Sequence, residues 1–333
     1  MDKRSTVDAA INHQSTDEVP FCISFARDAQ QSYGEQLAER YLTDHMRAAV
    51  TGGLLSVDEA IKLSIGNHVY LCNDKPWWGW HDVPDDFRNS LEAPSYVPGT
   101  RGFGSYERLA EKIRFVKEST GSYVLVLIYG SHFEKANACR GFEHFLGDLA
   151  GDKAFAKRLL DTIIRKNMVM LENLVTIADI DGFLLGSDWG SQESLLMSPD
   201  TWRDLIAPGE YLEYQLIKDA GKHVWVHSCG NIELVIPDLI DMGLDVLNPL
   251  QPECMDIYRI KDTYGSKLSF WGGISTQQTL PYGSPEDVRA ETRAVISYLS
   301  RDGGYIASPA QEIQADVPLE NVHALIDELR HPG

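Results

Sequence analysis

The chain has 333 residues, of which 43% are hydrophobic, and it carries a formal net charge of −19 at pH 7. This length is sufficient for one barrel-sized domain. A strongly acidic surface repels phosphate backbones and anionic lipids, so nucleic-acid and membrane partners are not expected. The five cysteines include no CxxC pair, which indicates a reducing compartment and no disulfide framework. Because the sequence begins without an apolar leader, we expect a cytoplasmic protein.

Residues 1–104 form the least regular part of the sequence. An apolar segment at 21–25 predicts the first strand, and helical patterns follow at 36–49 and 56–63. A loop rich in Trp and Pro comes next, with three tryptophans among residues 77–80. Such a loop either packs as a wall against the main body or serves as a lid or flat platform for substrate.

From residue 105 onward, the apolar pattern alternates between helices and short strands. This alternation is typical of a parallel sheet with helices on the outside. Ser198 and Ser284 are predicted helix N-caps, because each precedes a proline at the first helical position. The predicted strands are 123–129, 182–186, 223–226, 245–249, 267–271 and 304–307, and the predicted helices are 106–120, 141–177, 198–220, 232–242, 256–264, 284–301 and 318–329.

Seven strand candidates without an intervening linker favour a closed (β/α)8 TIM barrel over an open doubly wound sheet. No G-x-G-x-x-G follows a strand, and neither a P-loop nor a G-x-S-x-G elbow is present. We therefore expect an α/β fold with one barrel domain over residues 1–333. Its first part, 1–104, contributes an irregular extension and the Trp-rich loop, and 105–333 forms the regular β/α part.

Polar side chains follow most of the predicted strands. In a barrel, the carboxyl ends of the strands face one mouth, so these side chains predict an active site there. His227 and Cys229 are two positions apart at one strand end and point to the same side. Such a pair either contributes to a zinc site, which normally has three or four protein ligands, or is a buried histidine beside an inert thiol. The other candidates are Tyr129, Asp188, Gln192, Glu193, Asn248, Gln251, Gln277 and Gln311.

Several stretches between residues 181 and 327 resemble the uroporphyrinogen decarboxylase superfamily in order and spacing. That superfamily includes the cobamide-dependent methyltransferases of one-carbon metabolism. The resemblance implies a (β/α)8 barrel with its site at the carboxyl ends of the strands. The stretches are Gly-Ser-Asp-Trp-Gly-Ser-Gln at 186–192, Val-His-Ser-Cys-Gly at 226–230, Leu-Asn-Pro-Leu-Gln-Pro at 247–252, Phe-Trp-Gly-Gly-Ile-Ser-Thr-Gln at 270–277 and Asp-Val-Pro-Leu-Glu-Asn-Val at 316–322.

The chain is closer to the methyltransferase branch than to true uroporphyrinogen decarboxylases. True uroporphyrinogen decarboxylases share an arginine-rich stretch directly after the first strand, and this stretch binds the carboxylates of the substrate. At the same place this chain has only one arginine, Arg27, which is followed by Asp28. The methyltransferase branch carries His-x-Cys and a later Cys, and the zinc so held activates the thiol of a methyl acceptor. His227 and Cys229 match this pattern, but Gln311 stands where the late cysteine is expected.

The resemblance implies a methyltransferase that moves a methyl group between a methylated small molecule or C1 carrier and cobalt on a separate corrinoid protein. The metal that the resemblance implies is zinc, with His227 and Cys229 as ligands. In place of the late cysteine we predict Glu193 as the third ligand, with Asp188 or Cys254 as alternatives. Homodimers are common among such relatives and are expected here. The catalytic residues are predicted to be Asp188, His227 and Gln311, and the substrate-binding residues Gln192, Asn248, Gln251, Gln277 and Tyr129.

Three alternatives remain from the sequence. Without a metal, Asp188, Asn248 and Gln311 would bind a reduced pterin through its N–H and C=O groups. A second alternative is a metal-independent decarboxylase or lyase acting on a small carboxylic acid, with uroporphyrinogen decarboxylase itself less favoured. A third is a non-catalytic relative that binds a small ligand or a partner.

Overall fold

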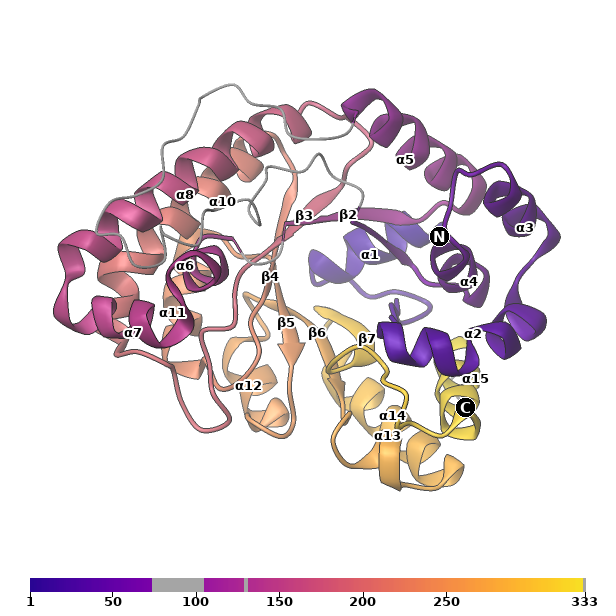
Figure 1. Ribbon diagram of the computed structural model, residues 1–333. Helices are drawn as coiled ribbons and strands as arrows, with labels where there is room; N and C mark the ends of the chain where they lie inside the picture. The colour runs from indigo at the N-terminus through magenta and orange to yellow at the C-terminus, as the bar shows by residue number, and fades with distance from the viewer. Residues whose placement is uncertain (74–104, 129–130, 332–333) are drawn as a thin grey trace. The chain divides into compact units, whose positions relative to one another are not determined.

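The computed structural model describes residues 1–73, 105–128 and 131–331 (Figure 1). The Trp-rich loop and Tyr129 therefore lie outside the described residues. The chain forms two compact units, the first made of Met1–Tyr70, Arg114–Val124 and Leu247–Gly333, and the second of Leu71–Ile113 and Leu125–Val246. The expectation of one domain over residues 1–333 stays a prediction.

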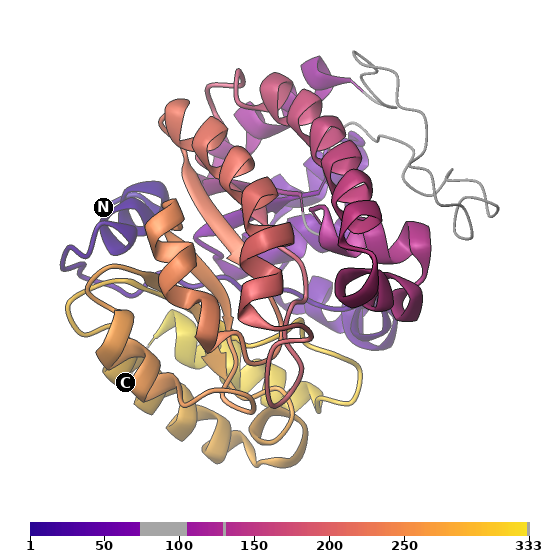
Figure 2. The ribbon, with the colours of Figure 1, turned by 90° about the vertical axis from the view of Figure 1, so that its left-hand side faces the viewer.

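The second unit is built on three neighbouring parallel strands. Strand β2 (Tyr123–Leu127) enters it from the first unit and pairs with β3 (Gly182–Leu185), which pairs with β4 (His223–His227). Helices α8 and α10 pack side by side, and α10 contacts β4 (Figure 2). The helical elements are α6 (Phe133–Arg140), α7 (Phe142–Gly151), α8 (Lys153–Leu174), α9 (Pro199–Thr201), the π-helical turn η3 (Trp202–Ile206), α10 (Ala207–Asp219), the 3-10 turn η4 (Glu233–Val235) and α11 (Ile236–Met242), while α5 (Tyr106–Thr120) belongs to both units.

The first unit contains β5 (Val246–Leu250), β6 (Ser269–Ile274) and β7 (Tyr305–Pro309), which follow one another in the sheet. The pair β6–β7 is parallel, with Phe270 opposite Tyr305. Together with the second unit, this arrangement confirms the predicted α/β class with parallel strands. The other elements of this unit are α1 (Lys3–Ile11), α2 (Arg27–Tyr41), α3 (Asp44–Thr51), α4 (Val57–Ile65), α12 (Ile257–Tyr264), α13 (Thr279–Tyr282), α14 (Pro285–Leu299) and α15 (Leu319–Arg330), while β1 (Val69–Cys72) belongs to both units.

The segment predicted as the first strand forms two isolated bridges, Phe21 to Ala307 and Phe25 to Ile313. The Cys22 N–H donates to the Ala307 carbonyl at 3.0 Å, so the segment lies beside β7. On its other side, the His68 N–H donates to the Phe21 carbonyl at 2.9 Å. It thus occupies a strand-like position between β7 and the residue that precedes β1. The prediction missed β1 itself, whose four residues are too few for a periodic pattern to stand out.

Two predicted helices are divided by side-chain caps. The pattern at 36–49 becomes α2 and α3, because the Thr43 side chain accepts a hydrogen bond from the Met46 N–H and begins a new helix. The pattern at 141–177 divides at Asp152, which accepts from the Phe155 N–H at 3.0 Å. The apolar periodicity continues across both breaks and therefore hides them. The predicted caps at Ser198 and Ser284 are confirmed, and Ser284 forms a reciprocal capping box with Asp287.

Within the described ranges, every helix is too short or too polar to cross a lipid bilayer.

We expect the stability of the protein to fall as the pH drops below about 6.5, in part through His68. His68 Nδ1 accepts from the Phe21 N–H at 3.3 Å, and Nε2 faces Glu18 Oε1 at 3.3 Å, so the folded state requires a neutral ring. Burial lowers the pKa of His68, against the opposing effect of Glu18. Below about pH 6.5 the unfolded chain therefore binds a proton at His68 that the folded chain does not bind. The stability that is present at higher pH is lost as the pH falls.

The measurement is the urea midpoint between pH 7 and pH 5 for the wild type and His68→Gln. We expect the variant to show the flatter profile, with a difference of at most about 1.4 kcal/mol for each pH unit. Replacement of the exposed His144 by Gln serves as the control. Equal slopes for the wild type and His68→Gln would contradict this role of His68.

Candidate functional site

The candidate site lies in the second unit, where β3 and β4 end. Leu185 pairs with Val226, so the residues that follow the two strands emerge at the same level. Asp188 is carried by the segment after β3, while His227 is the last residue of β4 and Cys229 follows two positions later. The structure therefore brings together three residues that are separated by up to 41 positions in the sequence.

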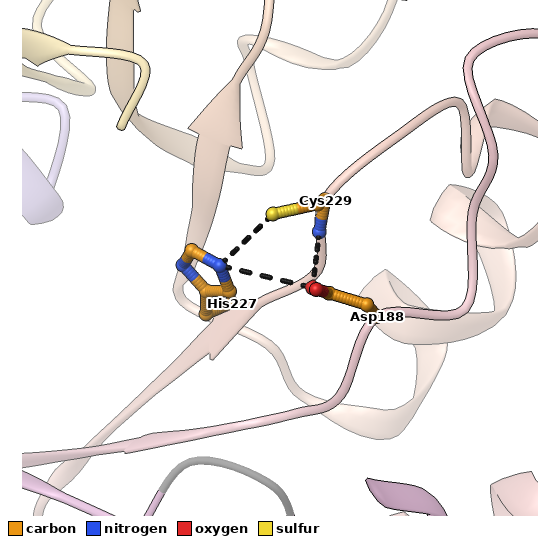
Figure 3. A group of neighbouring side chains, drawn as sticks. All are labelled: Asp188, His227 and Cys229. Carbon is orange, nitrogen blue, oxygen red and sulfur yellow. Dashed lines mark hydrogen bonds and ion pairs between the residues drawn. The ribbon is translucent and has the colours of Figure 1, made fainter. Parts of the chain in front are cut away.

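The three side chains form a close group (Figure 3). His227 Nε2 lies 3.3 Å from Cys229 Sγ and 3.8 Å from Asp188 Oδ1. The Cys229 backbone N–H donates to Asp188 Oδ1 at 2.8 Å, which orients the carboxylate toward the pair. The exposed fractions are 19% for the His227 side chain and 37% for Asp188, so a small molecule can reach the group.

Glycines allow the two segments behind this group to approach closely. Gly186 has φ +96°, and a Cβ at this position would overlap the backbone carbonyl oxygen of His227. At Gly190, a Cβ would lie 2.7 Å from the Cys229 carbonyl oxygen. The buried Ser228 hydroxyl accepts from the Trp189 N–H at 3.1 Å and links the same two segments. The backbone thus fixes Asp188 against the His227–Cys229 turn.

Glu134, near the start of α6, supports Asp188 from a third segment. Its Oε1 accepts from the Asp188 N–H at 3.3 Å, and its own N–H donates to Ser187 Oγ at 3.4 Å. Burial, and then the charge of Asp188, raise the pKa of Glu134. Sequence reasoning missed this residue, because an acidic residue at the beginning of a helix has no feature that separates it from surface carboxylates.

The donor atoms fit a zinc ion. Bond lengths of about 2.0–2.3 Å and tetrahedral angles place the ligand atoms about 3.3–3.7 Å apart. The His227–Cys229 distance of 3.3 Å and the His227–Asp188 distance of 3.8 Å are close to this range. Three protein ligands with one open position are the usual set of a catalytic zinc site. One imidazole, one thiolate and one carboxylate therefore suit zinc without a fourth protein ligand.

Two other predicted residues of the second unit, Glu193 and Gln192, lie on the loop after β3. Glu193 is exposed, and its N–H donates to Ser191 Oγ at 3.4 Å within its own loop. Gln192 lies in the same loop. Among the described residues, the group that suits a metal here contains Asp188 and does not contain Glu193. The ligand role of Glu193 and the substrate role of Gln192 stay predictions.

The remaining predicted residues belong to the first unit. Asn248 is buried, and its amide donates to the Trp271 carbonyl at 3.1 Å, while Gln251 is buried at the end of β5. Gln277 and Gln311 both line a pocket of about 360 Å³ beyond β6 and β7, together with Tyr282 and Asp316. Their predicted substrate and catalytic roles stay predictions.

Two curated proteins resemble parts of this chain. A methylated-thiol–coenzyme M methyltransferase of Methanosarcina mazei is 25% identical over 136 residues, which cover 41% of this chain and 34% of that protein. A uroporphyrinogen decarboxylase of Vesicomyosocius okutanii is 30% identical over 73 residues, which cover 22% of this chain and 21% of that protein. The chain thus matches about a third or less of the length of these curated relatives.

The likeness of the folds extends much further than these sequence matches. A solved methyltransferase from Methanosarcina mazei superimposes with a TM-score of 0.71 at 16% identity, over 99% of this chain and 98% of that one. Residues 98–331 match the uroporphyrinogen decarboxylase (URO-D) family, which is more than half of the sequence. The chain belongs to the uroporphyrinogen decarboxylase (URO-D) family.

Proposed function

We propose that the chain is a methyltransferase that moves a methyl group between a methylated small molecule or C1 carrier and a separate corrinoid protein. The observation that carries this proposal is the convergence of Asp188, His227 and Cys229 at the ends of β3 and β4. The partial match to a methyltransferase that acts on methylated thiols supports it. The proposal includes the complete (β/α)8 barrel predicted from the sequence and a cytoplasmic homodimer.

The three residues are proposed to bind zinc, with Asp188 as the third protein ligand in place of the absent late cysteine. When bound, zinc would act as a Lewis acid that keeps a coordinated thiol in its nucleophilic thiolate form. The chain itself holds the ligands in position, since the Cys229 N–H fixes the Asp188 carboxylate and Glu134 Oε1 accepts from the Asp188 N–H. The partial exposure of His227 and Asp188 leaves room for the acceptor to align with a methyl group for in-line displacement.

The test combines metal analysis with a methyl-transfer assay. The purified protein is incubated with methylated thiols or methoxylated compounds and with cob(I)alamin or a corrinoid protein, and the absorbance change of methylcobalamin formation is followed. We expect zinc-dependent transfer and about one zinc per chain at this site. Release of CO2 from small carboxylic acids, with neither zinc nor corrinoid dependence, would instead establish the decarboxylase alternative.

A further inference from the structure

A second group of ionisable side chains lies in the interior of the second unit. His132 precedes α6, and Glu210 and Glu213 lie on α10. One donor atom from each of these residues lies within 4.8 Å of the others. All three are completely buried. Isolated charges in such a place are costly unless each is paired or binds a cation.

The hydrogen bonds of this group fix where its protons are. His132 Nε2 lies 2.9 Å from the Ile206 carbonyl, and because a carbonyl only accepts, Nε2 must carry the proton. The Ser131 hydroxyl donates its single proton to Glu213 Oε2 at 2.6 Å. The Asn167 amide donates to Glu213 Oε1 at 2.8 Å, so both Glu213 oxygens accept hydrogen bonds.

Three polar atoms then face one another, and none of the hydrogen bonds described above places a proton between them. His132 Nδ1 lies 3.1 Å from Ser131 Oγ and 3.3 Å from Glu210 Oε1. In the neutral ring the proton lies on Nε2, so Nδ1 offers a lone pair. Neither oxygen of Glu210 accepts a hydrogen bond in suitable geometry from the described residues, although the hydroxyls of Tyr214 and Ser131 lie near.

Either a proton or a cation is therefore needed between Glu210 and His132, and the nearby ammonium of Lys135 donates to Asn167 Oδ1 at 3.0 Å. Burial, and then the charge of Glu213, raise the pKa of Glu210. A proton shared between Glu210 and His132 is therefore the alternative occupant of this gap, and a bound cation would replace it. A divalent cation would contact Glu210, the His132 lone pair and Glu213 together. A ring N–H that donates to a backbone carbonyl, as Nε2 does to Ile206, is also the usual support of a metal-ligating histidine.

We propose that His132, Glu210 and Glu213 bind a divalent first-row transition-metal ion, Zn²⁺ or Mn²⁺, at a second site separate from the Asp188 group. One imidazole and two carboxylates suit both ions. The backbone is shaped for the ring, since a Cβ at Gly209 would lie 2.9 Å from His132 Nε2 and 2.7 Å from Ile164 Cγ1. The site also follows a π-helical turn, a feature frequent at functional sites.

This ion would join the start of α6 to α10. Two residues after His132, Glu134 Oε1 accepts from the Asp188 N–H. Fixing the start of α6 would therefore help to position the backbone of Asp188. His132, Glu210 and Glu213 would thus act as positioning residues for the site formed by Asp188, His227 and Cys229.

The experiment uses a His227→Ala, Cys229→Ser double variant, in which the first site is disabled. This protein is loaded separately with Zn²⁺ or Mn²⁺, freed of excess metal, analysed for metal content and unfolded thermally with and without a chelator. We expect about one metal ion per chain and a fall in Tm of about 5 °C or more on chelation. Adding Glu210→Gln, which keeps the shape of the side chain, should remove both the metal and the effect of the chelator.

Asp219→Asn, an exposed change on the same helix, is the matched control and should retain the metal. If Glu210→Gln does not fold, the electron paramagnetic resonance spectrum of Mn²⁺ in the double variant still reports a bound ion. A double variant that holds neither ion and whose Tm ignores the chelator overturns the proposal. Because the first site is disabled throughout, this outcome is distinct from a failure of the proposed methyltransferase.

Discussion

Replacing Cys229 by Ser is expected to remove zinc from the Asp188–His227–Cys229 site and to lower methyl transfer by at least about 100-fold. The thiolate is the strongest of the three donors for zinc, and Sγ lies 3.3 Å from His227 Nε2. A serine hydroxyl keeps the size of the side chain but does not ionise near neutral pH. The measurement is the number of zinc ions per chain by elemental analysis, which should fall by about one relative to the wild type, together with the rate of methylcobalamin formation.

Cys254→Ser makes the same chemical change in the first unit and should retain both zinc and activity.

Two further variants decide whether Asp188 or Glu193 is the third zinc ligand. Asp188→Asn should weaken zinc binding, and Glu193→Gln should leave it unchanged, because Asp188 Oδ1 lies 3.8 Å from His227 Nε2 and Glu193 is outside this group. A full zinc content in Cys229→Ser would refute the site, and loss of zinc in Glu193→Gln alone would restore Glu193 as a ligand.

Gly186→Ala should destabilise the protein by about 3–5 kcal/mol and displace Asp188. Gly186 has φ +96°, which an alanine adopts only with strain. The added Cβ would also overlap the backbone carbonyl oxygen of His227 and lie 2.9 Å from Val226 Cγ1. Backbone atoms of a buried strand cannot move away without breaking the β3–β4 register. The free energy of unfolding in urea measures the effect.

Gly221→Ala separates the two causes. Gly221 has φ +70°, but a Cβ there would meet nothing within 4 Å. Its substitution should cost only the conformational strain, about 1–2 kcal/mol. If the two alanine variants are equally stable, the close approach of the segments after β3 and β4 does not exist as described.

The sequence by itself determined the elements whose signal is local. Short apolar runs bounded by turns placed β2, β3 and β4 within about two residues, because burial on both faces requires uninterrupted apolar side chains. The caps at Ser198 and Ser284 were readable because an N-cap acts on the next three residues. The proximity of His227 and Cys229 was also predictable from local sequence, because side chains two positions apart at a strand end lie on the same side.

Only the tertiary structure decided which distant residues meet. Asp188 joins His227 and Cys229 because β3 and β4 are in register, and Glu134 joins Asp188 because α6 begins beside them. The group of His132, Glu210 and Glu213 has no sequence signal, because its members are up to 81 positions apart and resemble ordinary helix residues until their burial is known. Burial and proximity arise from packing between elements, and a pattern along one element does not record what lies against it.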